Sequence, residues 1–239
     1  MCIRDSPKPD LDNASGGNMQ KISIVLFFFI YLNSSFAQEK LVVGTYDSFS
    51  ADWGPGPIIE EKFEEICNCD LQFISTSQAG TLNNEIFLNG KDVILGVEMH
   101  EFNYSIEDWH EYDHGFFSFI YDSSKLTDPP KTFEELVNRE DLKIVVQDPR
   151  TSPVGIGLLR WMKSIFKNDF SIKLKQLDQN IITYSPGWSE AYGIFLEGNA
   201  DLVLSYSTSP FYHQEYENEY KYKSLNFTEG HLALSLIHI

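Results

Sequence analysis

The sequence predicts an α/β fold with mainly parallel sheets, and two observations carry this prediction. Short apolar runs rich in β-branched and aromatic residues alternate along the chain with segments that carry helix-start signals or helical periodicity. This alternation is typical of strands joined by helical crossovers, which leave neighbouring strands parallel. Polar and aromatic clusters also follow several of the apolar runs directly. In open parallel sheets, ligands bind beyond these strand ends.

The individual elements follow from local composition. Strands are predicted where short apolar runs are bounded by turn residues: Leu41–Tyr46, Leu71–Ser75, Asp92–Val97, Phe116–Tyr121, Leu142–Gln147, Ile181–Tyr184 and Leu202–Tyr206. Helices are predicted where proline, a capping residue or helical periodicity opens a segment: Pro57–Ile66, Thr81–Leu88, a short helix after the capping box Thr132-x-x-Glu135, Pro153–Phe166, Phe170–Leu177 and Ser189–Leu196. No internal repeat and no low-complexity linker interrupts this order.

Both ends of the sequence match a transposon-end adapter used in DNA sequencing. The codons CTG TCT CTT ATA CAC ATC encode Leu234–Ile239, and the reverse complement of the same DNA encodes Met1–Asp5 and begins the codon of Ser6. We therefore interpret residues 1–6 and 234–239 as adapter-derived and leave them out of the fold prediction.

A signal peptide is predicted at residues 19–37. Met19 and Lys21 precede the apolar run Ile22–Leu32, and the small-x-small pattern Ser35-Phe36-Ala37 follows it. This run is too short to serve as a permanent membrane span. We therefore expect cleavage before Gln38, secretion to the periplasm, and an untranslated leader at residues 7–18.

About two hundred residues follow the signal peptide, enough for one large domain or two small lobes. Residues 1–37 carry as many basic as acidic side chains, so the formal net charge of −17 belongs to the remainder. Such acidity disfavours a nucleic-acid partner and suits cationic or neutral ligands. Cys67 and Cys69, spaced C-x-C in a secreted chain, are predicted to form a local disulfide, because a zinc site would need further ligands.

Clusters at the strand ends supply the candidate binding residues. Tyr46 and Asp47 follow the first predicted strand, Glu98 follows Asp92–Val97, and Tyr206 ends the last predicted strand. The same expectation covers three further aromatic residues that lie in turn-like contexts, namely Trp53, Trp188 and Tyr212. Aromatic faces beside carboxylates would suit a flat, delocalised cation. The competing interpretation is that these rings only fill the core.

Thr151-Ser152-Pro153 opens a predicted helix, with Ser152 as the N-cap residue and Pro153 in the first turn. Free N–H groups and the positive end of the helix dipole make this a possible phosphate site. An ordinary capped helix explains the same residues. Gly155 and Gly157 would permit a close approach to the backbone.

Two other kinds of site, a metal site and a catalytic site, would have diagnostic residues in the sequence. His110 and His114 could share a face and hold a metal if they were helical, although their surroundings read as a loop that enters a strand. No G-x-S-x-G, H-E-x-x-H or G-x-x-x-x-G-K-[ST] motif occurs in the sequence. A hydrolase therefore lacks a named nucleophile, and catalytic residues and cofactors are predicted to be absent.

Several longer stretches resemble the thiamine-binding receptors of ABC importers, which are type II periplasmic binding proteins. The resemblance runs from about Leu41 to His231 and rests on TYDSFSADWGPGP (45–57), CNC (67–69), QDPRTS (147–152), GWSEAYG (187–193), DLVLSYSTSPFYH (201–213) and NFTEGH (226–231).

The resemblance implies a two-lobed, monomeric receptor that closes on thiamine or its phosphate esters and delivers them to a membrane permease. Residues 38–125 would form the first part of lobe 1, residues 126–205 lobe 2, and residues 206–233 an incomplete return to lobe 1. By position, the aromatic part of the site would comprise Trp188, Tyr206 and Tyr212, with Tyr46 and Trp53 from the other lobe. Thr151 and Ser152 would lie near the phosphate or hydroxyethyl end.

The sequence departs from this family pattern in three ways. Glu98 stands where the family has an aspartate expected to meet the aminopyrimidine. The segment between Met99 and Tyr112 is shorter, and the family continues beyond His231, so the fold is expected to be incomplete at its C-terminus with apolar surface uncovered. Receptors for ferric ion or polyamines, and a secreted hydrolase of thiamine or phosphate esters, remain the alternatives.

Overall fold

The computed structural model describes residues 38–98 and 109–238, with the side chains of 231–238 left aside. The adapter residues 1–6, the leader and the signal peptide lie outside the described residues, as does most of the segment after Met99 that the sequence predicts to be short. In the part of the chain that is described, no helix has the length and apolar character needed to cross a membrane.

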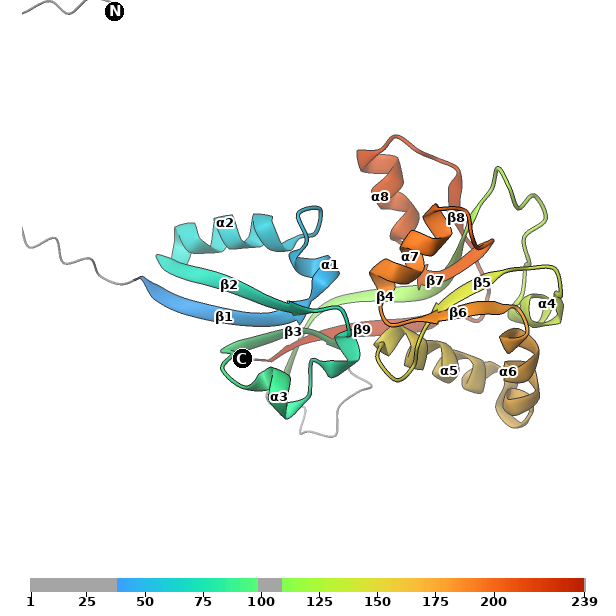
Figure 1. Cartoon of the computed structure of the whole chain (residues 1–239), viewed down its shortest axis with the longest axis horizontal. Coiled ribbons are helices and arrows are strands. Elements are labelled where there is room, and N and C mark those ends of the chain that lie inside the picture. The colour runs from blue at the N-terminus through green and yellow to red at the C-terminus, as the bar shows by residue number, and fades with distance from the viewer. Residues whose placement is uncertain (1–37, 99–108, 239) are drawn as a thin grey trace, which may run out of the picture. The chain divides into compact units, whose positions relative to one another are not determined.

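The strands of the described residues form one sheet, in the order β2-β1-β3-β9-β4-β7-β5-β6, with β8 paired to β4 (Figure 1). The strands are β1 (Glu39–Tyr46), β2 (Cys69–Thr76), β3 (Val93–Glu98), β4 (Trp109–Asp122), β5 (Ile144–Gln147), β6 (Ile181–Ser185), β7 (Leu202–Tyr206), β8 (Tyr222–Ser224) and β9 (His231–His238).

Parallel pairing occurs in two separate parts of this sheet. Strands β2, β1 and β3 are parallel neighbours, and so are β6, β5 and β7. The long strands β4 and β9 pair antiparallel with each other, and they join the two parts through β3 and β7. We call β1–β3 with their helices lobe 1, and β5–β7 with theirs lobe 2.

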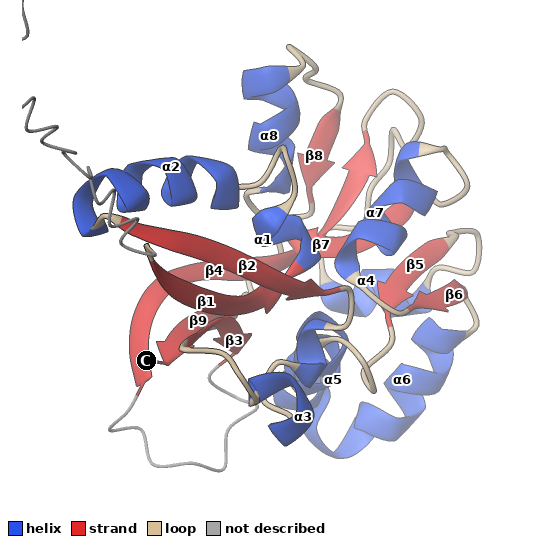
Figure 2. Cartoon of the chain, turned by 60° about the vertical axis from the view of Figure 1, so that its left-hand side comes forward, coloured by secondary structure: helices blue, strands red, loops and turns tan. Residues whose placement is uncertain are grey.

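Helices cover both faces of each parallel part (Figure 1, Figure 2). In lobe 1, α2 (Gly56–Cys67) lies on one side of the strands and α3 (Glu85–Leu88) on the other; α1 (Asp47–Ser50) and the 3₁₀ helix η1 (Ala79–Thr81) are short. In lobe 2, α5 (Pro153–Phe166) and α6 (Phe170–Asp178) lie opposite α7 (Trp188–Leu196). The remaining helices are α4 (Phe133–Asn138), η4 (Lys167–Asp169) and α8 (Ser209–Tyr216).

Most predicted elements are confirmed within a few residues, but the Thr81–Leu88 helix is wrong. It is broken between η1 and α3 because Thr81 Oγ1 donates to the Gln78 carbonyl at 2.8 Å and Thr76 Oγ1 accepts from the Gln78 N–H at 3.1 Å. Such side-chain bonds to the backbone compete with a continuous helix. The capping box is half formed: Thr132 Oγ1 accepts from Glu135 N–H at 3.0 Å, whereas the Glu135 carboxylate accepts from Lys131 N–H.

The structure also contains elements that the sequence did not predict. The segment around His110 and His114 is neither loop nor helix but the first half of β4. Helices α1 and α8 and strand β8 are additional, and α8 and β8 pack against each other. Strand β9 runs through residues 234–238, which the sequence analysis set aside, and these residues pair with β3 and β4.

The main hydrophobic core lies in lobe 2. Trp161 and Phe133 meet edge to face, with ring centroids 4.7 Å apart, and Phe119 packs beside both. Burial of such large rings contributes most of the hydrophobic stabilisation of a domain. The core of lobe 1 is smaller, and α2 leaves Ile58 and Ile66 58% and 84% exposed, so its outer face carries apolar surface.

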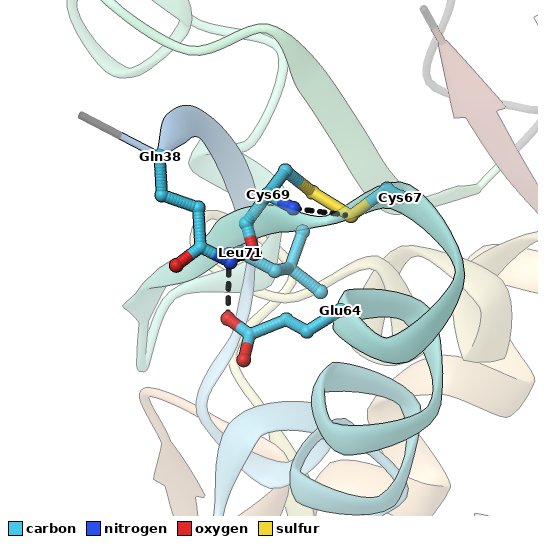
Figure 3. The surroundings of a disulfide bond; sticks show 5 residues. All are labelled: Gln38, Glu64, Cys67, Cys69 and Leu71. Carbon is cyan, nitrogen blue, oxygen red and sulfur yellow. Dashed lines mark hydrogen bonds between the residues drawn. A yellow bond between two sulfur atoms is a disulfide. The ribbon is translucent and has the colours of Figure 1, made fainter. Parts of the chain in front are cut away.

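A disulfide joins Cys67, the last residue of α2, to Cys69, the first residue of β2, with the Cα atoms 5.2 Å apart (Figure 3). Asn68 between them has a left-handed backbone (φ 54°), which asparagine tolerates better than most residues. Glu64 on the last turns of α2 accepts a hydrogen bond from Leu71 N–H at 2.8 Å. The disulfide therefore fixes the turn that sends the chain from α2 into the sheet.

Candidate functional site

A cavity of about 330 Å³ is lined by residues of both lobes. Of the candidate residues, seven line it: Tyr46, Asp47, Trp53, Glu98, Ser152, Trp188 and Tyr206. Several of them come from strand ends, as the sequence predicts: β1 ends at Tyr46, β3 at Glu98 and β7 at Tyr206. The carboxyl ends of parallel strands in both lobes therefore contribute to one site.

Tyr46 is held by an unusually close approach to β3. Gly96 has a φ of +95°, and a Cβ atom at this position would lie 2.2 Å from Tyr46 Cε1. Only glycine both adopts this backbone and leaves the space that the tyrosine ring occupies. Gly96 itself lines the cavity, so this contact sets the position of Tyr46 in the site.

Glu98 is buried, with 5% of its surface exposed, and it lies among the phenols of the site. Burial raises the pKa of Tyr206 well above its ordinary value, and the negative charge of Glu98 adds to the rise. Burial also raises the pKa of Tyr46, an effect that Asp113 reinforces and a hydrogen bond with Tyr112 opposes. Both phenols therefore stay protonated at neutral pH.

Trp188 begins α7, where it follows the N-cap residue Gly187. Its indole Nε1 donates to Ser205 Oγ at 2.7 Å, and its ring stacks on Tyr192 with centroids 4.8 Å apart. Trp53 of lobe 1 lies 6.2 Å from Trp188, centroid to centroid, and 6.1 Å from Tyr212. Trp53 and Trp188 form the aromatic wall of the cavity. Tyr212 does not line the cavity, but its ring contact with Trp53 places it beside this wall.

The start of α5 also reaches the cavity, through Ser152, Pro153 and Val154. Ser152 is the N-cap residue, but its side chain makes no capping hydrogen bond. Thr151 is not among the cavity residues; its Oγ1 donates to the Pro186 carbonyl at 2.8 Å. Of this predicted pair, the structure therefore brings only Ser152 to the site.

Gly155 and Gly157 do permit close approaches, but to the protein itself. A Cβ atom on Gly155 would lie 2.4 Å from the Gln147 carbonyl oxygen, and one on Gly157 would lie 2.1 Å from Phe117 Cε2. The two glycines therefore let α5 pack against β5 and β4.

The charged groups around the cavity are acidic. Its described lining includes the carboxylates Asp47, Glu98, Asp113 and Glu190, and it contains neither lysine nor arginine. Arg150, which lies nearby in sequence, is instead paired with Asp148, and this hydrogen-bonded pair holds the pKa of Asp148 at about 2. The cavity therefore combines aromatic faces with negative charge, which favours a cation.

Sequence reasoning missed Asp113 and Glu190 as cavity residues. Asp113 lies between the two histidines of the candidate metal pair, and Glu190 belongs to the GWSE start of α7. Of the histidines, His114 lines the cavity and His110 does not. Because both lie in the extended strand β4, His110 and His114 are about 13 Å apart along the chain. Among the described residues there is no group of three or more histidine, cysteine or acidic side chains suited to a metal.

Relatives of the chain identify its family, although no family model matches the chain. The chain is 39% identical over 224 residues to the thiamine-binding periplasmic protein of Escherichia coli, covering 82% of this chain and 68% of that protein. It is 38% identical over 222 residues to the thiamine-binding periplasmic protein of Brucella melitensis, covering 81% of this chain and 66% of that protein.

The fold agrees with these relatives. A solved structure of a periplasmic thiamin binding protein superposes with a TM-score of 0.79 at 36% identity, covering 85% of this chain and 73% of that chain. The chain spans about two thirds of the length of the curated relatives it matches, 66% and 68% for the two named above. The two-lobed α/β architecture is thus that of periplasmic binding proteins, and the chain belongs to the family of thiamine-binding periplasmic proteins.

Proposed function

We propose that this chain is the substrate receptor of an ABC importer, that it binds thiamine in the periplasm as a monomer, and that it delivers thiamine to the membrane permease. The observation that carries the proposal is the cavity lined by tryptophan and tyrosine rings together with carboxylates. The relatives are named thiamine-binding periplasmic proteins, which supports the same ligand.

The cavity chemistry matches the ligand. Thiamine joins a thiazolium cation to an aminopyrimidine, so it presents flat aromatic surfaces, one positive charge and an amino group. Trp188 and Trp53 would contact the rings, and each cation–π contact would contribute about 0.5–2 kcal/mol. Glu98, buried at 5% exposure, would accept a hydrogen bond from the aminopyrimidine. Desolvation strengthens a charge-assisted bond of this kind.

The hydroxyethyl or phosphate end of the ligand would lie near Ser152 at the start of α5. Ser152 lines the cavity and its side chain makes no capping bond, so its hydroxyl would be the group that meets this end of the ligand. Backbone N–H groups in the first turn of a helix favour an anion at this point. The remaining candidates would contribute without contacting the thiamine rings. Asp47 would add negative charge to the cavity, Tyr212 would support Trp53, and Thr151 would hold the turn before α5.

We assign binding without catalysis and without a cofactor, because the described lining residues include no nucleophile hydrogen-bonded to a base with an orienting group. A ferric receptor would need clustered tyrosine and histidine ligands, and a hydrolase would release product. Both alternatives predict observations that thiamine binding alone does not.

Calorimetric titration of the protein with thiamine tests the proposal. We expect saturable binding with one site per chain, no heat with maltose, putrescine or ferric citrate, and unchanged thiamine after prolonged incubation. Trp188→Ala should raise the thiamine Kd at least tenfold, because it removes both the ring contact and the wall behind it. Wild-type affinity in this variant would remove Trp188 from the site, and product formation would make the chain a hydrolase.

A further inference from the structure

We propose that Tyr192, His213 and Glu217 are positioning residues, which hold Trp188 in the orientation that the ligand meets. The inference rests on the proposed function, because it concerns the same aromatic wall. None of the three residues lines the cavity. They reach the ligand through Trp188, and they form a continuous chain of contacts from Trp188 to Glu217, the exposed C-cap residue of α8 (Ser209–Tyr216).

The first link is a column of three nearly parallel rings. Trp188 and Tyr192 lie four residues apart on α7 and therefore share a helix face. Their centroids are 4.8 Å apart with an interplanar angle of 19°, and Tyr192 continues to His213 at 5.7 Å and 10°. An aromatic ligand on the cavity side of Trp188 would extend this column by one ring.

The second link is a set of hydrogen bonds that fixes the rings of Tyr192 and His213. The Tyr192 hydroxyl lies 3.1 Å from His213 Nε2, and His213 Nδ1 lies 2.6 Å from Glu217 Oε2. A carboxylate only accepts, so Nδ1 donates to Glu217; in the neutral imidazole, Nε2 then accepts from the Tyr192 hydroxyl. Burial raises the pKa of Tyr192, which keeps this hydroxyl protonated.

The imidazole has little freedom to move. His213 is 3% exposed, and besides Tyr192 and Glu217 it contacts Tyr222 at 4.4 Å and Tyr212 at 5.7 Å, centroid to centroid. A buried imidazole with both nitrogens hydrogen-bonded is fixed in tautomer and in orientation. The side chain of Glu217 is 48% exposed, so the last member of the chain is open to mutation without disturbing the core.

Trp188 needs this support because its hydrogen bond to Ser205 fixes one edge of the ring only. The bond from Nε1 to Ser205 Oγ, at 2.7 Å, holds one edge of the indole, and Ser205 Oγ in turn lies 2.7 Å from Ser209 Oγ. A single hydrogen bond leaves rotation of the ring about that edge. Of its two ring contacts among the described residues, the tilted one with Trp53 and the stacked one with Tyr192, only the stacked one lies nearly parallel to the indole, so we assign control of the ring plane to the Tyr192–His213–Glu217 chain.

The test uses two substitutions of Glu217, the C-cap residue of α8, and one of Glu215 within the helix. Glu217→Ala should raise the thiamine Kd about fivefold, in the range found for residues that act through an intermediate contact. Glu217→Gln, whose amide oxygen still accepts from Nδ1–H, should restore the Kd to within about twofold of wild type. Glu215→Ala, on the same helix but outside this chain of contacts, is the matched control and should leave the Kd unchanged.

A spectroscopic readout separates positioning from general stability. The near-ultraviolet circular dichroism of Trp188, isolated by subtraction of the Trp188→Phe spectrum, should change in Glu217→Ala and return in Glu217→Gln. A Glu217→Ala protein with wild-type Kd and wild-type Trp188 signal, even with a lowered Tm, would overturn the inference.

The two proposals fail in different ways. Absence of thiamine binding by the wild-type protein would reject the proposed function, and the ligand-free Trp188 signal would still decide whether Glu217 acts on that ring. Thiamine binding that is indifferent to Glu217→Ala would reject the positioning inference alone.

Discussion

Replacement of Gly96 by alanine should damage thiamine binding through Tyr46, although Gly96 offers the ligand no side chain. The added Cβ would lie 2.2 Å from Tyr46 Cε1 and 2.5 Å from Cδ1. Carbon atoms cannot approach so closely, so the tyrosine ring must leave its position at the end of β1. Gly96→Ala thus displaces one aromatic wall of the cavity and leaves the others in place.

Gly96→Ala should change two quantities, the free energy of unfolding and the thiamine Kd. A non-glycine residue at φ +95° costs about 1–2 kcal/mol in backbone strain, and this lowers the free energy of unfolding. Loss of one aromatic contact to a cation costs about 0.5–2 kcal/mol of binding free energy, which corresponds to an increase of about 2–30-fold in the thiamine Kd. The first part changes stability, and the second changes affinity.

Gly90 supplies a matched control. It also has a positive φ, +73°, but a Cβ atom there would meet nothing within 4 Å. Gly90→Ala should therefore lower stability by the backbone strain alone and leave affinity unchanged. Calorimetry with thiamine and chemical denaturation of both variants measure the two quantities. Equal thiamine affinities in Gly96→Ala and Gly90→Ala would refute the role assigned to Tyr46.

Three further predictions concern stability. Trp161→Ala should lower the free energy of unfolding by about 3–5 kcal/mol in denaturant titrations, because Trp161 is 1% exposed in the main core; a loss below 1 kcal/mol would show that the core is misassigned. Arg150 holds the pKa of Asp148 at about 2, below the ordinary 3.8, so this pair stabilises the fold above the ordinary pKa and is lost as the pH falls toward about 2. Asp148→Asn should flatten the pH profile of stability in that window, and an unchanged profile would contradict the pairing. Reduction of the disulfide, or its replacement in a Cys67→Ser, Cys69→Ser variant, should cost less than about 2 kcal/mol, since the closed loop is very short; complete unfolding on reduction would contradict this.

The parallel parts of the fold could be predicted because each strand there is a short apolar run with its own boundaries. The long antiparallel strands could not. β4 begins at Trp109, and its first half is polar and exposed, so composition indicated a strand only from Phe116. α8 was missed because its large aromatic residues, such as Phe211 and Tyr216, lie exposed and form no buried stripe.

The candidate site was predictable where position along a strand determines position in space. Tyr46, Glu98 and Tyr206 lie at the carboxyl ends of β1, β3 and β7 and meet at one cavity. The sequence could not show which way a side chain turns, so Thr151 was expected at the cavity although its hydroxyl bonds to Pro186. Asp113 was missed because the path of β4 past the cavity depends on its pairing with β9 and β7, which are distant in sequence.

Calorimetric titration of the wild-type protein beside Trp188→Ala measures whether this cavity binds thiamine through its aromatic faces and carboxylates. We expect saturable binding of thiamine at one site per chain, with a Kd at least tenfold higher in the variant. Binding of equal strength in both proteins, or no binding by a folded wild-type protein, would contradict this expectation.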